Sequence, residues 1–580
     1  MRDTLQRLHA WLEETHATRF ELCRHFFLRF FDSDLVSTPG QWRVVAIGAF
    51  AILLSSSVLF IQAYWHKYIG LDVLPTPEPY RLAVVADALF LITFSMFVIG
   101  LFATLQWPSL FPGLRDYLAL ASLPLRMREV FVAKFTALAG FAGMFVIATT
   151  LPPSLILPMM IAGRYSNHPT MQVPALFVSC SLAALFVFFS LVAVQGILLN
   201  LLPHRQFVRV SLAAQGVLLT VLLCGFPLVF SISALQDSMN QRPDWAVWVP
   251  PVWFLGLDQV IAGNREPMAV RLAWIGLGAV AGATAAAVLA YLWSYRRHRV
   301  RLLETPAGVP RAERRDWGAS FAGRVMPDPR KLAVFAFIAK TLARSRHHRL
   351  VLTAYSAIAI AVIFESFVSL ALDGGIRRLL VESPALREAA VSAPLALSLF
   401  VLAGFRYLFR IPVELPANWV FRVNEPGNRR AFLDATELFL LTCAVAPVAL
   451  VTLPLEILLL GPRTGIAASV LCLLPSLILM EILLVRFEKV PFTSSYMPGR
   501  RPPVETLLIY GMAVMVYVSV LGSIVSWAVK GPRSTLGMCA ILLAIWWKVR
   551  RGRREDWEFG KLEFEELPEP AIQTLSIQKD

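Results

Sequence analysis

Long apolar stretches separated by short polar segments run through the whole of this 580-residue chain. An apolar helix of about 17–25 residues is long enough to cross the hydrocarbon core of a membrane. Twelve stretches at least this long carry almost no charge, and they lie at residues 44–65, 82–104, 135–162, 173–202, 210–235, 272–295, 350–372, 389–405, 438–461, 464–485, 506–529 and 531–547. The pattern predicts an all-α integral membrane protein with about twelve transmembrane helices.

The basic residues are distributed unevenly between the two sides that these crossings define. Hydrophobic residues make up 57% of the chain and charged residues 16%, and the formal net charge is +15. With residues 1–43 placed in the cytoplasm, 42 of the 54 Lys and Arg fall on cytoplasmic segments. This is the positive-inside pattern, and it explains the charge without a nucleic-acid partner. We therefore expect a multi-pass protein of a bacterial-type inner membrane, in contact with lipid, with both termini in the cytoplasm.

A polar, Arg-rich stretch at 296–349 divides the chain into two halves of six predicted spans. We expect residues 1–43 to form a cytoplasmic amphipathic segment. This segment lacks the features of a cleaved signal peptide, so we expect it to be retained. A first six-helix half follows at 44–295, then the linker at 296–349, a second half at 350–547 and a cytoplasmic tail at 548–580. An amphipathic helix precedes the first span of each half, with apolar positions at Phe20, Cys23, Phe27 and Phe30, and at Leu332, Phe335, Ile338 and Leu342. Such helices lie in the membrane interface or serve only as topology signals.

The two halves match each other at an offset of 302 residues. Ten identities occur over 34 positions, which pair Pro124 with Pro426, Arg128 with Arg430, Ala133 with Ala435, Leu138 with Leu440, Ala142 with Ala444, Val146 with Val448, Thr150-Leu151-Pro152 with Thr452-Leu453-Pro454, and Leu157 with Leu459. Because each half has an even number of spans, both copies share one orientation. We expect an internal duplication and two pseudo-symmetric six-helix bundles.

The sequence contains no motif of a catalytic, nucleotide or metal site. There is no G-x-x-x-x-G-K-[ST] phosphate loop, no H-E-x-x-H and no G-x-S-x-G. We expect no cofactor, no metal and no enzymatic activity in this chain. The pair His347-His348 is interpreted as part of a solvated cytoplasmic face, and the six cysteines as packing residues.

Four acidic residues fall within predicted spans, where a charge is costly: Asp87, Glu365, Glu456 and Glu481. One interpretation is that they line a proton or substrate pathway. The other is that they form hydrogen bonds between helices or lie near the lipid headgroups. Asp87 and Glu365 are the stronger candidates for a functional role. The outside segment 236–271 is rich in Trp and Pro and is expected to dip into the outer leaflet or to form an interfacial lid.

The polar segments after the second and eighth spans resemble the cytoplasmic elements of ABC-type exporter permeases of the type-2 class. The first is the run from Asp116 through Leu123-Pro124-Leu125-Arg126 to Arg128 and Ala133-Lys134. The stretch Val249-Pro250-Pro251-Val252-Trp253-Phe254 is similar to a Pro-Pro-x-Trp stretch of that family. In the second half, Pro416-Ala417-Asn418-Trp419-Val420-Phe421-Arg422 resembles a motif of fused bacterial permeases of this kind.

The resemblance implies a transmembrane subunit whose ATPase is a separate protein, acting as a dimer. Such an ATPase moves the membrane helices through rigid cytoplasmic elements that fit grooves on it. In this chain the corresponding elements are residues 116–128, the predicted first coupling segment, and residues 414–430, the predicted second coupling segment. Pro124 and Pro426 would set the turns, and the arginines that would pair with ATPase carboxylates, unless they only fix topology, are Arg126, Arg128, Arg429 and Arg430.

Two other functions fit twelve spans with cytoplasmic termini. A secondary transporter of the major facilitator type has the same count, but its Gly, Asp and paired-Arg loop signature is matched only poorly by Gly113-Leu114-Arg115-Asp116. A membrane enzyme or scaffold would need a constellation of residues that the sequence does not show. The substrate cannot be read from the spans.

Overall fold

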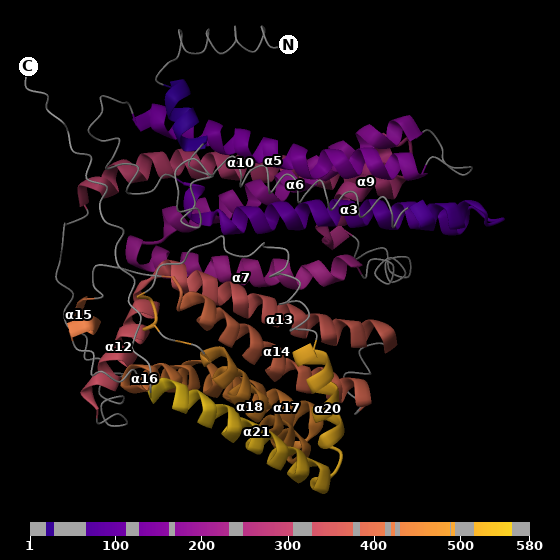
Figure 1. Ribbon diagram of the computed structural model, residues 1–580. Helices are drawn as coiled ribbons and strands as arrows, with labels where there is room; N and C mark the ends of the chain where they lie inside the picture. The colour runs from indigo at the N-terminus through magenta and orange to yellow at the C-terminus, as the bar shows by residue number, and fades with distance from the viewer. Residues whose placement is uncertain are drawn as a thin grey trace, which may run out of the picture. The chain divides into compact units, whose positions relative to one another are not determined.

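A computed structural model describes the chain at residues 19–27, 65–111, 127–161, 169–230, 247–304, 328–374, 383–411, 419–423, 430–485, 487, 489–493 and 516–558. These residues form helices and connecting turns without a strand (Figure 1). The predicted all-α class is confirmed. The chain divides into two compact units, unit 1 at Met1–Val309 and unit 2 at Pro310–Asp580, and the boundary falls within the predicted linker.

Eight helices are long and apolar enough to cross a membrane, so the chain is a multi-pass membrane protein. They are Glu78–Leu105, Arg128–Ile161, Met171–Leu201, Pro267–Ser294, Arg346–Leu370, Pro384–Leu408, Phe432–Leu460 and Pro462–Leu484, and each coincides with a predicted span. The predicted spans at 210–235 and 506–529 correspond to shorter described apolar helices, Arg209–Gly225 and Val516–Ala528. The twelfth lies in a helix whose second half is strongly basic, and nearly all of the first lies outside the described residues.

Unit 1 is built around one central helix. Its helices are α3 (Glu78–Leu105), α5 (Met127–Ile161), α6 (Pro169–Leu201), α7 (His204–Phe230), α9 (Pro250–Ile261) and α10 (Pro267–Glu304). Helix α6 packs against all five of the others (Figure 1). A Cβ atom on Gly196 of α6 would lie 2.6 Å from the Cβ of Ala290, so this glycine lets α6 approach α10 closely.

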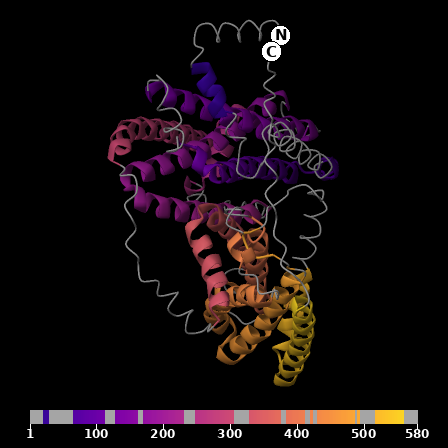
Figure 2. The same cartoon turned by 60° about the vertical axis from the view of Figure 1, so that its left-hand side comes forward.

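Unit 2 contains α12 (Pro329–Arg344), α13 (Arg346–Gly374), α14 (Pro384–Leu408), the short α15 (Trp419–Val423), and α16 (Arg430–Leu440). A π-helical turn, η5 (Leu441–Val445), joins α16 to α17 (Ala446–Leu460), and α18 (Pro462–Leu484), η6 (Val516–Val520), α20 (Leu521–Ala528) and α21 (Pro532–Glu558) follow. Helix α14 packs against α13, α17, α18 and α20. Helix α21, in yellow in Figures 1 and 2, runs along one side of this unit against α18.

Helix pairs recur between the two units. The contacts α3–α6, α5–α6 and α6–α10 in unit 1 have the counterparts α14–α18, α17–α18 and α18–α21 in unit 2. At the positions paired by the 302-residue offset, Ala133, Leu138, Ala142, Val146 and Thr150 are buried, and so are their partners Ala435, Leu440, Ala444, Val448 and Thr452. Thr150 and Thr452 each donate their hydroxyl to the carbonyl four residues earlier. Helix α9 has no counterpart among the described residues of unit 2.

The structure adds detail to three sequence interpretations. Within the outside segment 236–271, α9 begins with two prolines in its first turn and packs on α6 and α10, with Phe254 buried. In the first amphipathic helix Leu22 and Phe26 are buried, with the predicted Cys23 and Phe27 partly buried beside them. In the second, Val334 and the predicted Ile338 are buried, and the predicted Phe335 and Leu342 are partly buried. His348 is buried, which makes its assignment to a solvated face wrong.

Candidate coupling site

Two of the six predicted coupling residues lie within the described chain. Arg128 is exposed in the first turn of α5, and Arg430 is half-buried as the first residue of α16. Pro124, Arg126, Pro426 and Arg429 lie outside the described residues, so the structure does not place them. What it does define is how the chain on either side of each predicted coupling segment is held.

The chain that enters the first coupling segment is fixed by uncharged hydrogen bonds. Trp107 is completely buried, and its indole N–H donates to the Ser211 hydroxyl at 2.9 Å. The side-chain amide of Gln195 donates to the Trp107 carbonyl at 2.7 Å, and the Tyr291 hydroxyl donates to the Leu110 carbonyl. Helices α6, α7 and α10 thereby hold the last turn before the segment, because each of these buried carbonyls would otherwise lack a partner.

The chain that enters the second coupling segment is held by His348 and Phe492. The His348 Nε2–H donates to the Ile411 carbonyl at 3.2 Å, which leaves Nδ1 to accept from the Ser345 hydroxyl at 2.6 Å. The backbone N–H of Phe492 donates to the Phe409 carbonyl at 3.1 Å. Phe492 adopts a left-handed φ of 66°, a conformation that costs a non-glycine residue about 1–2 kcal/mol. Its buried ring packs on Phe409 and His348, which keeps the chain in this conformation.

Helix α15 lies inside the second coupling segment and is docked by one aromatic side chain. The Phe421 ring contacts Phe337 of α12, with centroids 5.1 Å apart, and Phe432 of α16, at 6.3 Å. Its neighbours point the other way, since Val420 is 42% exposed and Val423 is 74% exposed. This five-residue helix is therefore anchored by one partly buried aromatic ring and exposes Val420 and Val423.

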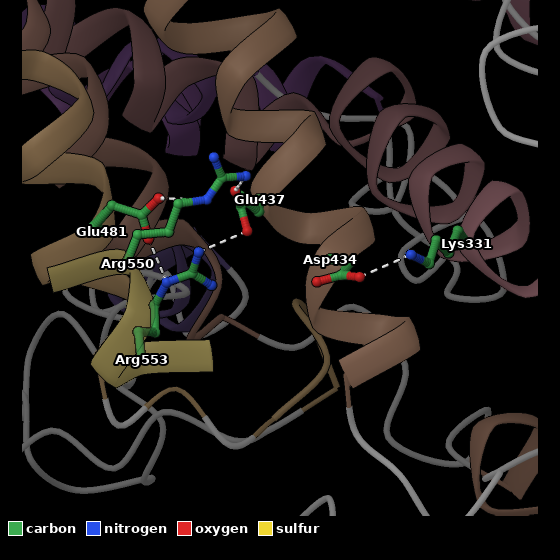
Figure 3. Close-up of polar contacts among 6 residues, drawn as sticks. All are labelled: Lys331, Asp434, Glu437, Glu481, Arg550 and Arg553. Carbon is green, nitrogen blue, oxygen red and sulfur yellow. Dashed lines mark hydrogen bonds and ion pairs between the residues drawn. The ribbon is translucent and has the colours of Figure 1, made fainter. Parts of the chain in front are cut away.

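The end of the second coupling segment is fixed by ion pairs on α16, which Figure 3 shows. Lys331 of α12 pairs with Asp434 at 2.7 Å, and one turn further along, Glu437 faces two arginines of α21. Arg550 Nη2 lies 2.9 Å from Glu437 and Arg553 Nη2 lies 2.6 Å from it. Helices α12 and α21 are therefore both joined to α16 through charged side chains.

The ionic cluster is defined as Glu437, Glu481, Arg550 and Arg553, and all of these except the partly exposed Arg550 are buried. The side chains of Arg553 and Glu481 are 0% exposed, and Arg553 Nε donates to Glu481 (Figure 3). Trp557 covers the guanidinium of Arg553 at 3.9 Å. Charges taken out of water in this way are tolerated only when they are paired, so Glu437 and Glu481 fix α21 against α16 and α18.

Asp87 is not an isolated intramembrane charge. Its carboxylate accepts hydrogen bonds from Lys67 at 2.7 and 2.8 Å and from the Tyr68 hydroxyl at 2.6 Å. Glu365 is exposed on α13 and has no hydrogen bond or ion pair with another described residue. The structure buries Glu456, between α17 and α18.

Sequence reasoning missed the partners that complete these sites. Lys67 and Tyr68 lie 20 and 19 residues before Asp87, in a segment that the hydropathy pattern assigned to an outside loop. Arg550 and Arg553 were counted only as topology signals, although their spacing of three places both on one face of a helix. That spacing, with Glu481 inside a predicted span, is the signal that the sequence offers.

Among the described residues, no group of three or more His, Cys, Asp or Glu could hold a metal ion. Comparison with protein-family models, with curated proteins and with solved structures found no match to this chain. Functional inference therefore depends on the geometry of the chain itself.

Proposed function

We propose that this chain is the transmembrane permease subunit of an ATP-driven exporter, with two six-helix halves that arose by duplication and with hydrolysis performed by a separate ATPase. It resides in a bacterial-type inner membrane with both termini in the cytoplasm. The observation that carries the proposal is the second coupling segment. Its entry is held by His348 and Phe492, its exit by the ion pairs of α16, and between them α15 exposes Val420 and Val423.

Force applied in the cytoplasm would have to pass from α15 to the membrane spans. A partner that closes on α15 can displace the spans only if the segment is rigidly joined to them. Phe421 contacts α12 and α16. Helix α16 continues through η5 into α17, and the candidate span Phe432–Leu460 includes most of α16 and all of α17. The buried ionic cluster adds α18 and α21 to the same body. A push on α15 would therefore move several spans together.

The proposed duplication is supported by more than the sequence offset. The same helix pairs recur in both units, and the matched positions on α5 and on α16–α17 are buried in both. In each unit an amphipathic helix packs beside the helix that follows the coupling segment, with Phe27 against Phe141 in unit 1 and Phe335 against Phe439 in unit 2. These correspondences favour one ancestral six-helix module with its own coupling segment.

The experiment is capture of an ATPase by the intact, affinity-tagged chain, extracted in detergent from its native membrane. We expect an ATPase with a phosphate loop, encoded next to this chain, to co-purify with it. Charge reversal of the four predicted arginines, Arg126, Arg128, Arg429 and Arg430, to Glu should reduce capture at least tenfold. Arg551→Glu is the matched control, because Arg551 is an exposed arginine at the same predicted side but outside the coupling segments. Undiminished capture by the fourfold variant would sink the coupling proposal.

A second variant tests α15 separately from the arginines. Val423→Asp places a charge on the exposed surface of α15 without touching Phe421, so the fold is expected to survive and ATPase capture to fall. The matched control is Val73→Asp, since Val73 is also highly exposed but lies in a predicted outside loop. Equal losses in the two variants would mean that α15 does not dock a partner.

The alternative is a secondary transporter of the major facilitator type, with the same number of predicted spans. It needs no ATPase, and its transport would follow an ion gradient. Capture of no ATPase, together with the absence of an ATPase gene beside this one, would favour that alternative.

A further inference from the structure

A cavity of about 270 Å³ lies within unit 1 at the end of the helices that the charge pattern places outside. Helices α3, α5, α6 and α9 surround it. Its walls are mostly apolar, with Val84, Ala88, Leu157, Leu176 and Leu255 among them. The polar residues that line it include Arg81, Gln172, Asp258, Gln259 and Asn264. An apolar cavity with a few convergent polar groups is the usual form of a small-molecule site.

One residue that lines this cavity carries a buried acceptor with no donor among the described residues. The Oε1 atom of Gln172, in the first turns of α6, is buried and accepts no hydrogen bond from a described residue. A buried amide oxygen without a partner costs about 1–3 kcal/mol. An N–H or O–H group of a ligand that reached this oxygen would supply the missing donor.

A second acceptor, the Asp258 carboxyl of α9, also lines the cavity. No described residue donates a hydrogen bond to it or forms an ion pair with it. Burial raises the pKa of Asp258 to about 7, as expected for a carboxyl group that lacks a cationic neighbour. Arg81 borders the same cavity, but its side chain is exposed to solvent and forms no ion pair with Asp258.

We propose that this cavity binds a primary ammonium group carried on a short apolar body, with Asp258 and the Gln172 carbonyl oxygen as its acceptors. A primary ammonium has three N–H donors and one positive charge, so it can satisfy both acceptors at once. A quaternary ammonium has no N–H donor and leaves Gln172 unpaired. The ligand is the headgroup of an ethanolamine phospholipid or a small soluble amine, and the site does not depend on the proposed ATPase.

The size of the cavity limits the ligand. Pockets that enclose drug-sized molecules have volumes of about 300–1,000 Å³. At about 270 Å³, this cavity accommodates a headgroup or a small amine but not a large amphiphile in full. With a lipid, only the ammonium end would be enclosed, and the acyl chains would extend outside.

The experiment uses the full chain and two kinds of probe. In one arm, the protein is reconstituted with equal amounts of ethanolamine and choline phospholipids with matched acyl chains, re-extracted, and its retained lipids are quantified by mass spectrometry. In the other arm, the melting temperature in detergent is measured with n-propylamine, n-propanol or tetramethylammonium. The variants are Asp258→Asn and Gln172→Met, and the control is Glu266→Gln, which changes an exposed carboxylate near the same end.

We expect at least fivefold retention of ethanolamine over choline lipid if the ligand is a lipid, or a stabilising shift with propylamine alone if it is a soluble amine. Either preference should disappear in Asp258→Asn and Gln172→Met and persist in Glu266→Gln. Gln172→Met keeps the test valid if Asp258→Asn does not fold. Equal retention of both lipids with no amine-specific shift overturns the proposal. So does a preference that survives both substitutions.

Discussion

Substitution of Arg553 by Met tests whether the ionic cluster holds α21 in unit 2. Methionine keeps most of the volume and the contact with Trp557 but removes the charge that faces Glu437 and Glu481. The two carboxylates stay buried and retain only Arg550, whose nitrogens lie 2.9 Å from Glu437 and 3.7 Å from Glu481. The substitution therefore leaves one cation near two anions in a site that excludes water.

The magnitude follows from the burial of the pair. Removing one partner of a buried ion pair costs about 3–5 kcal/mol, because the other charge is left uncompensated. Arg550 compensates part of the lost charge, so we expect the lower end, about 3 kcal/mol. For a domain of 150–250 residues, each kcal/mol lowers the melting temperature by roughly 2–4 °C. The expected loss is then on the order of 6–12 °C.

The assay is thermal unfolding of the purified chain, followed with a fluorophore that reacts with cysteine thiols. Cys472 of α18 is buried in unit 2 and becomes reactive when that unit opens. The matched control is Arg551→Met on the same helix, since Arg551 is 64% exposed and pairs with Glu555, which is 60% exposed. Such exposed pairs contribute about 0.3–0.5 kcal/mol. If Arg553→Met melts within 1 °C of Arg551→Met, the cluster does not hold α21 and the reasoning fails.

Three further predictions concern unit 1 and use the same melting assay, with Cys180 as the buried reporter. Gly256→Ala places a Cβ 2.5 Å from a side-chain atom of α10 and should lower the free energy of unfolding by about 1–3 kcal/mol. In Gly278→Ala the new Cβ meets nothing within 4 Å, so this control should not be destabilised. Equal effects of the two substitutions would contradict the close approach of α9 and α10. Lys67→Met leaves Asp87 with the Tyr68 hydroxyl as donor and should lower the free energy of unfolding by about 1–2 kcal/mol. The effect is smaller than for a fully buried ion pair because Lys67 is partly exposed. Adding Asp87→Asn should restore most of the lost stability. Asp258 has a pKa of about 7 in the folded protein, above its unfolded value, so its contribution to stability falls as pH rises from about 4 to 7. Asp258→Asn should remove this decline. An unchanged pH profile of the melting temperature would contradict the raised pKa.

The positions of the spans were predictable because hydropathy is a local property of the chain. All eight helices that are long and apolar enough to cross a membrane coincide with predicted stretches. Lipid excludes water from every backbone N–H and C=O, so an apolar stretch of this length can only be helical. The division near residue 309 was predictable for the same reason, since the Arg-rich linker interrupts the apolar pattern.

The packing faces of the helices were not predictable, because lipid tails are as apolar as a protein core. Leu458 and Val451 of α17 are largely exposed, whereas Val448 and Thr452 of the same helix are buried, and the polar Thr452 is on the buried side. Hydrophobicity therefore does not separate the two faces of a span. The same ambiguity left Val334 out of the predicted apolar face of α12, although it is as deeply buried as Ile338, which was predicted.

The local pattern of residues is enough to establish that this protein is helical, spans the membrane many times, and carries matching positions at an offset of 302 residues. Which charges meet depends on the packing of the helices. Arg553 reaches Glu481 and Glu437 across 72 and 116 residues of sequence, and His348 reaches the Ile411 carbonyl across 63. Ion pairs and hydrogen bonds act over a few ångströms, so they depend on how distant segments pack and not on the local pattern that specifies each helix.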